Sequence, residues 1–326
     1  GWTRLPSLAR TRHGGQWIAA FALASGEPVY GLGEKFGPLN KRGQLIHSRV
    51  EDALGVNTGL AYKNTPFAWS PGTGHGAWGV FVHTPGRVAH GVGHPDWSHR
   101  SYALVVDDEA LDLFLFAADT PARILDAYTD LTGRAPEVPR WSLGLWVSRA
   151  YYKTPEEAVG VAAKLRERRI PCDVITLDGR AAWKVETRFN FRWDPDRFAD
   201  PRASLAAIRQ HHLRVCVWEY PYVSIHDPLF QELVAKEFLL RNAYGDPYVF
   251  SWDTDPATSP FGNVLTPLPE SGILDFTNPA AYAWWRDAHA GLFEDGVDVI
   301  KSDFGEQIPD DAVAFNGDRG RRLHNV

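Results

Sequence analysis

The pattern of apolar and polar positions changes character near residues 136–139. Before that point, short apolar segments alternate with turns rich in Gly, Pro and Asn, which is typical of β-strands. One amphipathic helix is predicted over 120–132, with Thr120 as its N-cap and Pro121 in its first turn. Strands of this kind are expected to pack as a β-sandwich. They are predicted at 17–23, 77–82, 101–106 and 111–116.

After residue 139, buried strands alternate with helices, and three of the predicted helices open with a cap residue followed by proline. This alternation predicts βαβ units and a parallel sheet. Four units are half of a (β/α)₈ barrel, for which ~250 residues are typical. A smaller doubly wound sheet is the alternative, but no glycine-rich phosphate motif follows any strand. The predicted strands are 141–147, 173–177, 213–218 and 297–301, and the predicted helices start at 154, 200 (continuing to His212), 228 (to 237) and 278 (to 293).

The predicted fold class is therefore α/β, with two domains. Residues 1–136 are expected to form an N-terminal β-sandwich that is incomplete at the front, and residues 137–326 the first half of a (β/α)₈ TIM barrel. The sequence contains no Met, and its last residues have no terminal character, so we interpret it as an internal piece of a longer protein.

Charge and composition narrow the classes of partner. The chain has 34 Lys and Arg against 40 Asp and Glu, a net charge of -6, which argues against nucleic-acid binding. No run of about 18 apolar residues is present, so no membrane span is expected. Cys172 and Cys216 lie in apolar runs and are predicted to be reduced core thiols. A cytoplasmic location is favoured without being fixed, and a homo-oligomer is possible.

Acidic residues follow three of the predicted parallel strands. Asp178 follows the second strand, Glu219 the third, and the segment 301–306 ends the fourth. In a barrel, the carboxyl ends of the strands meet at the functional face. A single acidic residue at the end of a strand is more often a helix cap or part of an ion pair in a loop. Acidic residues at the ends of three successive strands favour a functional site.

The fourth strand carries the pair that points to chemistry. Lys301 and Asp303 are two residues apart, so their side chains are expected on the same side of the strand. A neighbouring cation favours the ionised form of a carboxylate, and an ionised carboxylate is what attack on a sugar carbon requires. A structural ion pair is the alternative.

The segment 298–306 resembles the nucleophile region of glycoside hydrolase family 31, in the branch that holds bacterial α-xylosidases. Several blocks at consistent spacing are more specific than one motif. Further blocks similar to the family occur in the same order at 30–36, 61–67, 143–146, 191–195 and 275–279.

The resemblance implies a role for each matching residue. Asp303 matches the nucleophile that forms a covalent glycosyl-enzyme intermediate. Trp141 and Trp193 are assigned to packing. The implied substrate contacts are Asp178 and Lys301 on sugar hydroxyls, Trp218 as an aromatic wall, Tyr151 near the sugar, Asp52 on a sandwich loop over the barrel mouth, and Arg180 and Glu306 as further binding candidates.

Two departures from the family's pattern concern specificity. After Asp178 the α-xylosidases carry a bulky run that crowds the space of a hydroxymethyl group, whereas this chain has Gly-Arg-Ala-Ala-Trp at 179–183, which leaves room for a larger sugar. Arg180 is a candidate for contacting an anionic substituent, but an ion pair with Asp178 or Glu219 is expected instead. Glu219 and Tyr220 stand where a neutral Ile-Asn pair is usual.

The predicted function is retaining, exo-acting hydrolysis of terminal α-linked xylose or glucose from an oligosaccharide or α-glycoside. The resemblance places the general acid/base beyond the fourth strand, and retention needs two carboxyl groups about 5–5.5 Å apart, so this chain alone is expected to be inactive. An α-glucanotransferase and a carbohydrate-binding protein without catalysis are the alternatives. No serine-nucleophile motif, metal-ligand spacing or cofactor motif is present, and no metal or cofactor is expected.

Overall fold

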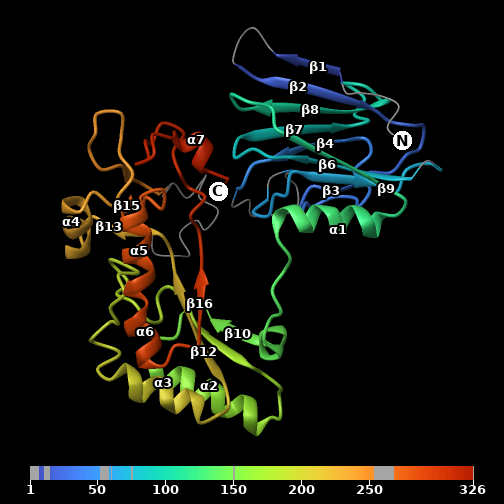
Figure 1. Ribbon diagram of the computed structural model, residues 1–326. Helices are drawn as coiled ribbons and strands as arrows, with labels where there is room; N and C mark the ends of the chain where they lie inside the picture. The colour runs from blue at the N-terminus through green and yellow to red at the C-terminus, as the bar shows by residue number, and fades with distance from the viewer. Residues whose placement is uncertain are drawn as a thin grey trace. The chain divides into compact units, whose positions relative to one another are not determined.

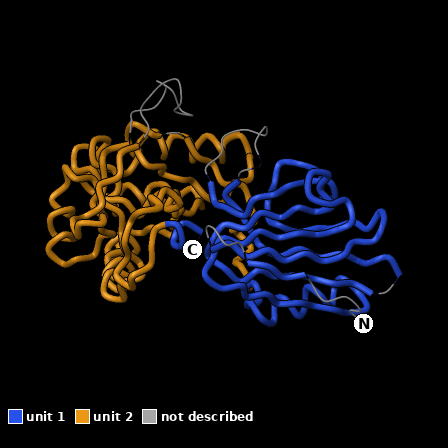
Figure 2. The backbone as a smooth tube through the Cα atoms, turned by 90° about the horizontal axis from the view of Figure 1, so that it is seen from above, with its two compact units in different colours: residues 1–136, 321–326 blue, residues 137–320 orange. Residues whose placement is uncertain are grey.

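The computed structural model describes residues 7–10, 15–51, 59, 61–74, 76–149, 151–252 and 268–325. The chain divides into two compact units (Figures 1 and 2). The first, here called the sandwich unit, comprises Gly1–Pro136 together with Arg321–Val326, and the second, the barrel unit, comprises Glu137–Gly320.

The sandwich unit is built from two antiparallel sheets, as predicted. Side chains of β8 (Ser101–Asp107) alternate between buried and half-buried, the pattern of a strand with one face in a core. Phe21, Val80 and Leu104 lie in that core. One sheet has the order β1 (Ser7–Arg10), β2 (Trp17–Ala22), β8, β7 (Arg87–Val92), β4 (Gln44–Ser48), and the other β3 (Tyr30–Gly31), β5 (Phe67–Ser70), β6 (Ala77–Val82), β9 (Leu113–Ala118).

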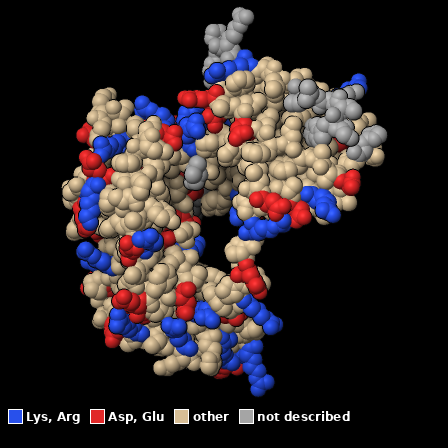
Figure 3. Space-filling view, viewed as in Figure 1, with Lys and Arg blue, Asp and Glu red and all other residues tan. Residues whose placement is uncertain are grey.

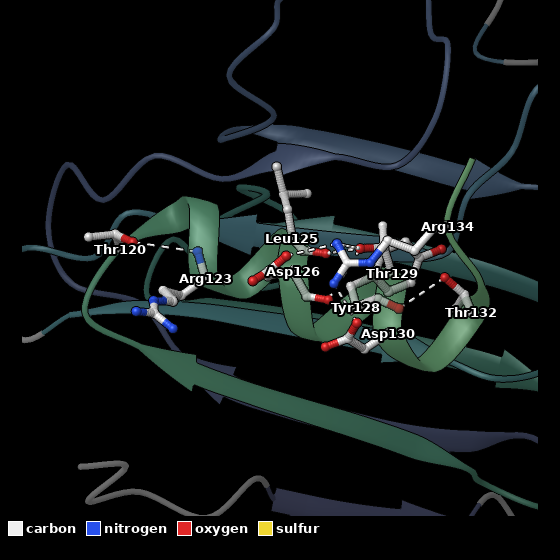
Figure 4. Close-up of polar contacts among 9 residues, drawn as sticks. All are labelled: Thr120, Arg123, Leu125, Asp126, Tyr128, Thr129, Asp130, Thr132 and Arg134. Carbon is white, nitrogen blue, oxygen red and sulfur yellow. Dashed lines mark hydrogen bonds and ion pairs between the residues drawn. The ribbon is translucent and has the colours of Figure 1, made fainter. Parts of the chain in front are cut away.

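The predicted helix at 120–132 is confirmed as α1 (Pro121–Thr132). The Thr120 hydroxyl accepts a hydrogen bond from the backbone N–H of Arg123, which caps the helix (Figure 4). Tyr128 stacks on Phe67 with ring centroids 3.9 Å apart, so the apolar face of the helix covers the sheet β3-β5-β6-β9. Arg134 binds Asp126 and Asp130 on the exposed face.

The barrel unit contains the predicted parallel sheet, with strand order β10-β11-β12-β16. Its central strands are buried along nearly their whole length, whereas both outer strands are half-buried to exposed. The helix starts are confirmed, because a cap side chain followed by proline opens each of α2 to α5. The strands are β10 (Trp146–Arg149), β11 (Val174–Leu177), β12 (Arg214–Glu219) and β16 (Val299–Ser302), and the helices α2 (Pro155–Glu167), α3 (Pro201–Arg209), α4 (Pro228–Ala235), α5 (Pro279–Ala288) and α6 (Ala290–Asp295).

Several predicted boundaries were wrong. Residues 141–147 are not one buried strand, because Arg140–Leu143 forms a 3₁₀ turn in which Ser142 Oγ donates to the Pro139 carbonyl, and β10 starts only at Trp146. The helix predicted to reach 293 is broken at His289 into α5 and α6. His212 lies beyond α3 with a φ of 54°, which ends that helix.

A small antiparallel sheet between β12 and α5 was not predicted. It has the order β13 (Tyr222–Ser224), β15 (Ser271–Ile273), β14 (Val249–Phe250). Strands of two or three residues are too short to show an alternation of apolar and polar positions.

The chain re-enters the sandwich unit at Arg321, within the short helix α7 (Gly320–Leu323). Arg322 pairs with Asp108 at 2.8 Å, and the Val50 backbone N–H donates to Asn325 Oδ1 at 2.9 Å. These last residues are therefore part of the sandwich unit and not of the barrel unit.

No helix in the described ranges is long and apolar enough to cross a bilayer. On the face seen in Figure 3, Lys and Arg side chains are interspersed with Asp and Glu rather than gathered in one basic stripe. This distribution agrees with the net charge of -6.

Candidate active site

The predicted site residues of the barrel unit gather at the carboxyl ends of its parallel strands. Asp178 follows β11, Trp218 lies near the end of β12, and Asp303 follows β16. Trp218 stands opposite Lys301 in the ladder, and Glu219 stands opposite Ser302. Because side chains alternate along strands, one face carries Trp218 and Lys301 and the other carries Glu219 and Ser302.

Two groups, an indole N–H and an ammonium, hold the carboxylate of Asp303. Trp218 Nε1 donates to Asp303 Oδ2 at 2.6 Å, and Lys301 Nζ lies 3.3 Å from the same oxygen. The other oxygen, Oδ1, accepts only a 3.2 Å bond from the Phe304 backbone N–H among the described residues. The Asp303 side chain is 25% exposed, so its carboxylate remains accessible in part.

Lys301 joins the two candidate carboxylates. Its Nζ lies 3.4 Å from Asp178 Oδ2, which also accepts from Ser148 Oγ at 3.3 Å. Burial lowers the pKa of Lys301, but the charges of Asp178 and Asp303 outweigh burial and raise it above its ordinary value. Lys301 is therefore a fixed cation between two acids.

Trp218 is held in place by its neighbours. The side chain is buried, its ring centroid lies 4.6 Å from that of Tyr220, and a Cβ added at Gly179 would stand 3.1 Å from its indole ring. A larger residue at position 179 would therefore press on the ring that bonds Asp303. The sequence suggested an aromatic wall, whereas the observed contact is an N–H donated to a carboxylate.

The expected ion pair of Arg180 with Asp178 or Glu219 was wrong. Within the part of the chain that the structure describes, the Arg180 guanidinium instead lies 5.4 Å over the ring of Tyr151, a cation–π contact. Glu219 is occupied elsewhere, because its carboxylate bonds His289 Nε2 at 2.6 Å and Ser302 Oγ at 2.5 Å. The predicted site residues Tyr151 and Arg180 thus contact one another.

Two further candidates lie elsewhere. Glu306 is buried. The pKa of Tyr222 is raised mainly by burial and further by the charge of Glu306. The Tyr222 hydroxyl accepts a hydrogen bond from the Gln307 backbone N–H. The chain reaches Glu306 through Phe304 and Gly305, both in the left-handed region, so it turns sharply after Asp303. Asp52 lies outside the described residues.

Sequence reasoning missed His289 and Ser302 as partners of Glu219. His289 stands 70 positions away from Glu219, inside what was predicted as one continuous helix. The one available signal was the acid at position 219, where the resemblance leads one to expect a neutral residue. An acid in an otherwise apolar strand needs a buried partner.

Within the described ranges, no group of three or more His, Cys, Asp and Glu side chains is arranged to hold a metal ion. His83 pairs with Asp112 on the surface, and His90 is enclosed in the sandwich core. The arrangement at the strand ends is instead one of carboxylates held by N–H and ammonium donors, which suits attack on an electrophilic carbon.

The two units define a class of protein, an antiparallel β-sandwich followed by a parallel sheet with helices. Residues 8–89 match the Glycosyl hydrolase 31 N-terminal galactose mutarotase-like domain, and residues 135–326 match the Glycosyl hydrolases family 31 TIM-barrel domain. The chain belongs to glycoside hydrolase family 31.

Named relatives agree with that assignment. The chain is 34% identical over 303 residues to alpha-xylosidase XylQ of Lactiplantibacillus pentosus, covering 92% of this chain and 37% of the relative. It is 29% identical over 316 residues to alpha-glucosidase 2 of Bacillus thermoamyloliquefaciens, covering 91% and 37%. The dextranase FjDex31A of Flavobacterium johnsoniae, solved with glucose, has the same fold, with a TM-score of 0.83 at 24% identity over 98% of this chain and 38% of that one.

The chain therefore spans a little over a third of the length of the relatives it matches. It is a family 31 chain whose relatives include an α-xylosidase and an α-glucosidase.

Proposed function

We propose that the whole protein is a retaining, exo-acting α-glycosidase that hydrolyses terminal α-linked xylose or glucose, with Asp303 as its nucleophile. The observation that carries the proposal is the Asp303 carboxylate at the carboxyl end of the parallel sheet, bonded by Trp218 Nε1 and Lys301 Nζ. Membership of family 31 supports a glycosidase over other uses of such a site.

In the first step, an Asp303 oxygen attacks the anomeric carbon while the bond to the leaving oxygen breaks. Oδ1 is the better candidate for attack, because Oδ2 already accepts from two donors and Oδ1 from only one backbone N–H. The leaving oxygen takes a proton from a second carboxyl group, which we expect outside this chain. Water then attacks the glycosyl-aspartate, so that the sugar leaves with retained configuration.

Lys301 and Asp178 are proposed to bind hydroxyl groups of the sugar. The 3.4 Å contact between Lys301 Nζ and Asp178 Oδ2 would let one hydroxyl accept from the ammonium and donate to the carboxylate. Such bonds strengthen as charge develops on the ring and so lower the barrier.

The choice between xylose and glucose turns on the segment after Asp178. Gly179, Ala181 and Ala182 are small, so this segment crowds the hydroxymethyl group that distinguishes glucose less than the bulky run of the α-xylosidases would. The guanidinium of Arg180 lies over the ring of Tyr151, and its N–H donors are our candidates for contacting a substituent of the substrate. We therefore favour a sugar with a substituent at C5.

The test is to treat the whole protein with 5-fluoro-α-xylosyl and 5-fluoro-α-glucosyl fluorides and to map the label by peptide mass spectrometry. Fluoride leaves without needing a proton, so the first step is isolated. We expect a covalent adduct on Asp303, formed faster by the glucosyl reagent, and no adduct or turnover in the Asp303→Asn variant. An adduct on a different carboxylate, or full activity of that variant, would rule out the assignment.

A further inference from the structure

The buried Glu219 and the half-buried His289 form an ion pair on the opposite face of the sheet from Lys301. Glu219 is 6% exposed, and its Oε2 lies 2.6 Å from His289 Nε2. His289 stands at the junction of α5 and α6, which lie beside β12 and β16 in Figure 1. A barrel strand normally presents apolar side chains to the helices that cover it, so an acidic side chain at this position calls for a specific explanation.

Both ring nitrogens of His289 face hydrogen-bond acceptors. Nδ1 lies 2.7 Å from the Trp285 carbonyl oxygen, which cannot donate, and Nε2 faces the Glu219 carboxylate. Burial lowers the pKa of His289, but the hydrogen bond and charge of Glu219 outweigh burial and raise it. Among the described residues, the ring also makes aromatic contacts with Phe191, Trp285 and Phe293. Glu219 is therefore the counterion of an imidazolium.

Glu219 also holds the segment that ends in Asp303. Its Oε1 accepts a 2.5 Å hydrogen bond from Ser302 Oγ, and its backbone oxygen accepts from the Asp303 N–H at 2.9 Å. In the described sheet β16 pairs with β12. At the end of this strand pair, Glu219 makes one side-chain contact and one backbone contact with the segment that leads into Asp303.

We propose that Glu219, His289 and Ser302 are positioning residues that set the place of the Asp303 carboxylate from the rear of the sheet. The proposal rests on Asp303 being the nucleophile. His289 fixes the Glu219 carboxylate, Glu219 fixes Ser302 and the Asp303 backbone, and the fixed backbone keeps Asp303 Oδ2 at 2.6 Å from Trp218 Nε1. A buried ion pair adds little stability compared with apolar packing, which agrees with a role in geometry.

The test compares His289→Gln with Arg286→Gln in the whole protein. Both changes remove one cation near the end of α5, but Arg286 pairs only with the exposed Asp287 among the described ion pairs. We expect His289→Gln to lower kcat by about 10- to 100-fold with KM within about twofold, because sub-ångström misplacement of a nucleophile acts on the chemical step. Arg286→Gln should match the wild type.

A double apolar variant separates positioning from stability. Glu219→Met with His289→Leu replaces the ion pair by side chains that pack, so the midpoint of thermal unfolding should return to that of the wild type. We expect kcat to stay low, since Ser302 still lacks its acceptor. Recovery of kcat together with stability would make the pair merely structural and overturn the proposal. If His289→Gln fails to fold, Ser302→Ala serves instead, with kcat expected to fall about 3- to 10-fold.

Hydrogen exchange gives a readout that needs no substrate. The amide of Asp303 is bonded to Glu219, so its exchange should be at least about tenfold faster in His289→Gln and unchanged in Arg286→Gln. If the wild-type protein turns over no α-glycoside and takes no label, the proposed function fails, while this exchange still decides whether the pair holds the strand end. Unchanged exchange would overturn the positioning role.

Discussion

At the scale of single residues, the site depends on which atoms donate to the Asp303 carboxylate. The Lys301 ammonium and the Trp218 indole N–H both reach Oδ2, and both come from positions that face one another in the ladder. The two-residue spacing of Lys301 and Asp303 predicted their shared side correctly. The indole bond could not be predicted, because it depends on the register between β12 and β16, which are separated by about 80 residues in sequence.

Removing the indole donor should impair catalysis more than folding. Trp218→Phe keeps an aromatic ring against Tyr220 and Gly179 but loses the 2.6 Å bond to Asp303. A hydrogen bond to a charged group contributes about 1.5–3 kcal/mol, so we expect kcat of the whole protein to fall about 10- to 100-fold.

Trp17→Phe is the matched control for this change. The Trp17 indole donates to the Glu109 carbonyl within the sandwich unit, whereas Trp218 and Asp303 belong to the barrel unit. Steady-state kinetics of both variants with an aryl α-glycoside checks the prediction. An equal kcat in Trp218→Phe and wild type would show that the indole N–H does not orient the nucleophile.

At the scale of secondary structure, cap residues followed by proline predicted helix starts reliably, whereas apolar runs alone did not predict strand boundaries reliably. Cap residues followed by proline placed the starts of α2, α3 and α5 correctly. The apolar run at 141–147 was misread, because hydrophobicity alone does not distinguish a strand from a 3₁₀ turn followed by a strand. The break at His289 was not foreseen, since no proline interrupts the chain between Ala280 and Phe293.

The cap of α3 allows a quantitative test. Asp200 accepts a 3.0 Å hydrogen bond from the Ala203 backbone N–H. Asp200→Ala removes the acceptor and should lower the free energy of unfolding by about 1 kcal/mol. Asp200→Asn keeps an acceptor of similar capping strength and should stay close to the wild type. Urea titration of the three proteins measures the difference, and equal losses in both variants would mean that the charge of Asp200 matters rather than its cap.

At the scale of the whole molecule, the order of the two architectures was predictable and the path of the chain's last described residues was not. The change of periodicity near residue 136 coincides with the border between the two compact units. The return of 321–325 to the sandwich rests on specific contacts, such as Arg322 with Asp108 and Asn325 with Val50. Pairs more than 200 residues apart leave no local pattern in a single sequence.

The sandwich unit carries a buried histidine that should make it sensitive to acid. His90 lies between Ser48 Oγ at 2.9 Å and the Tyr102 hydroxyl at 2.8 Å, with no exposed surface. Burial, with help from the charges of Lys35 and His47, lowers the pKa of His90 to about 3. In the unfolded chain the same group binds its proton at its ordinary pKa of about 6.5.

The sign of the effect follows from proton uptake. Below pH 6.5 the unfolded chain holds a proton on His90 that the folded chain does not, so stability falls by about 1.4 kcal/mol per pH unit, or about 2 kcal/mol between pH 7 and pH 5. His47, whose pKa is also lowered by burial, acts in the same direction. The difference between the urea midpoints at pH 7 and pH 5 should therefore be smaller in His90→Gln than in the wild type, whatever the variant's absolute stability. His83→Gln, which alters a histidine that is exposed beside Asp112, is the matched control. An unchanged pH dependence in His90→Gln would mean that the buried imidazole takes up its proton in the folded state.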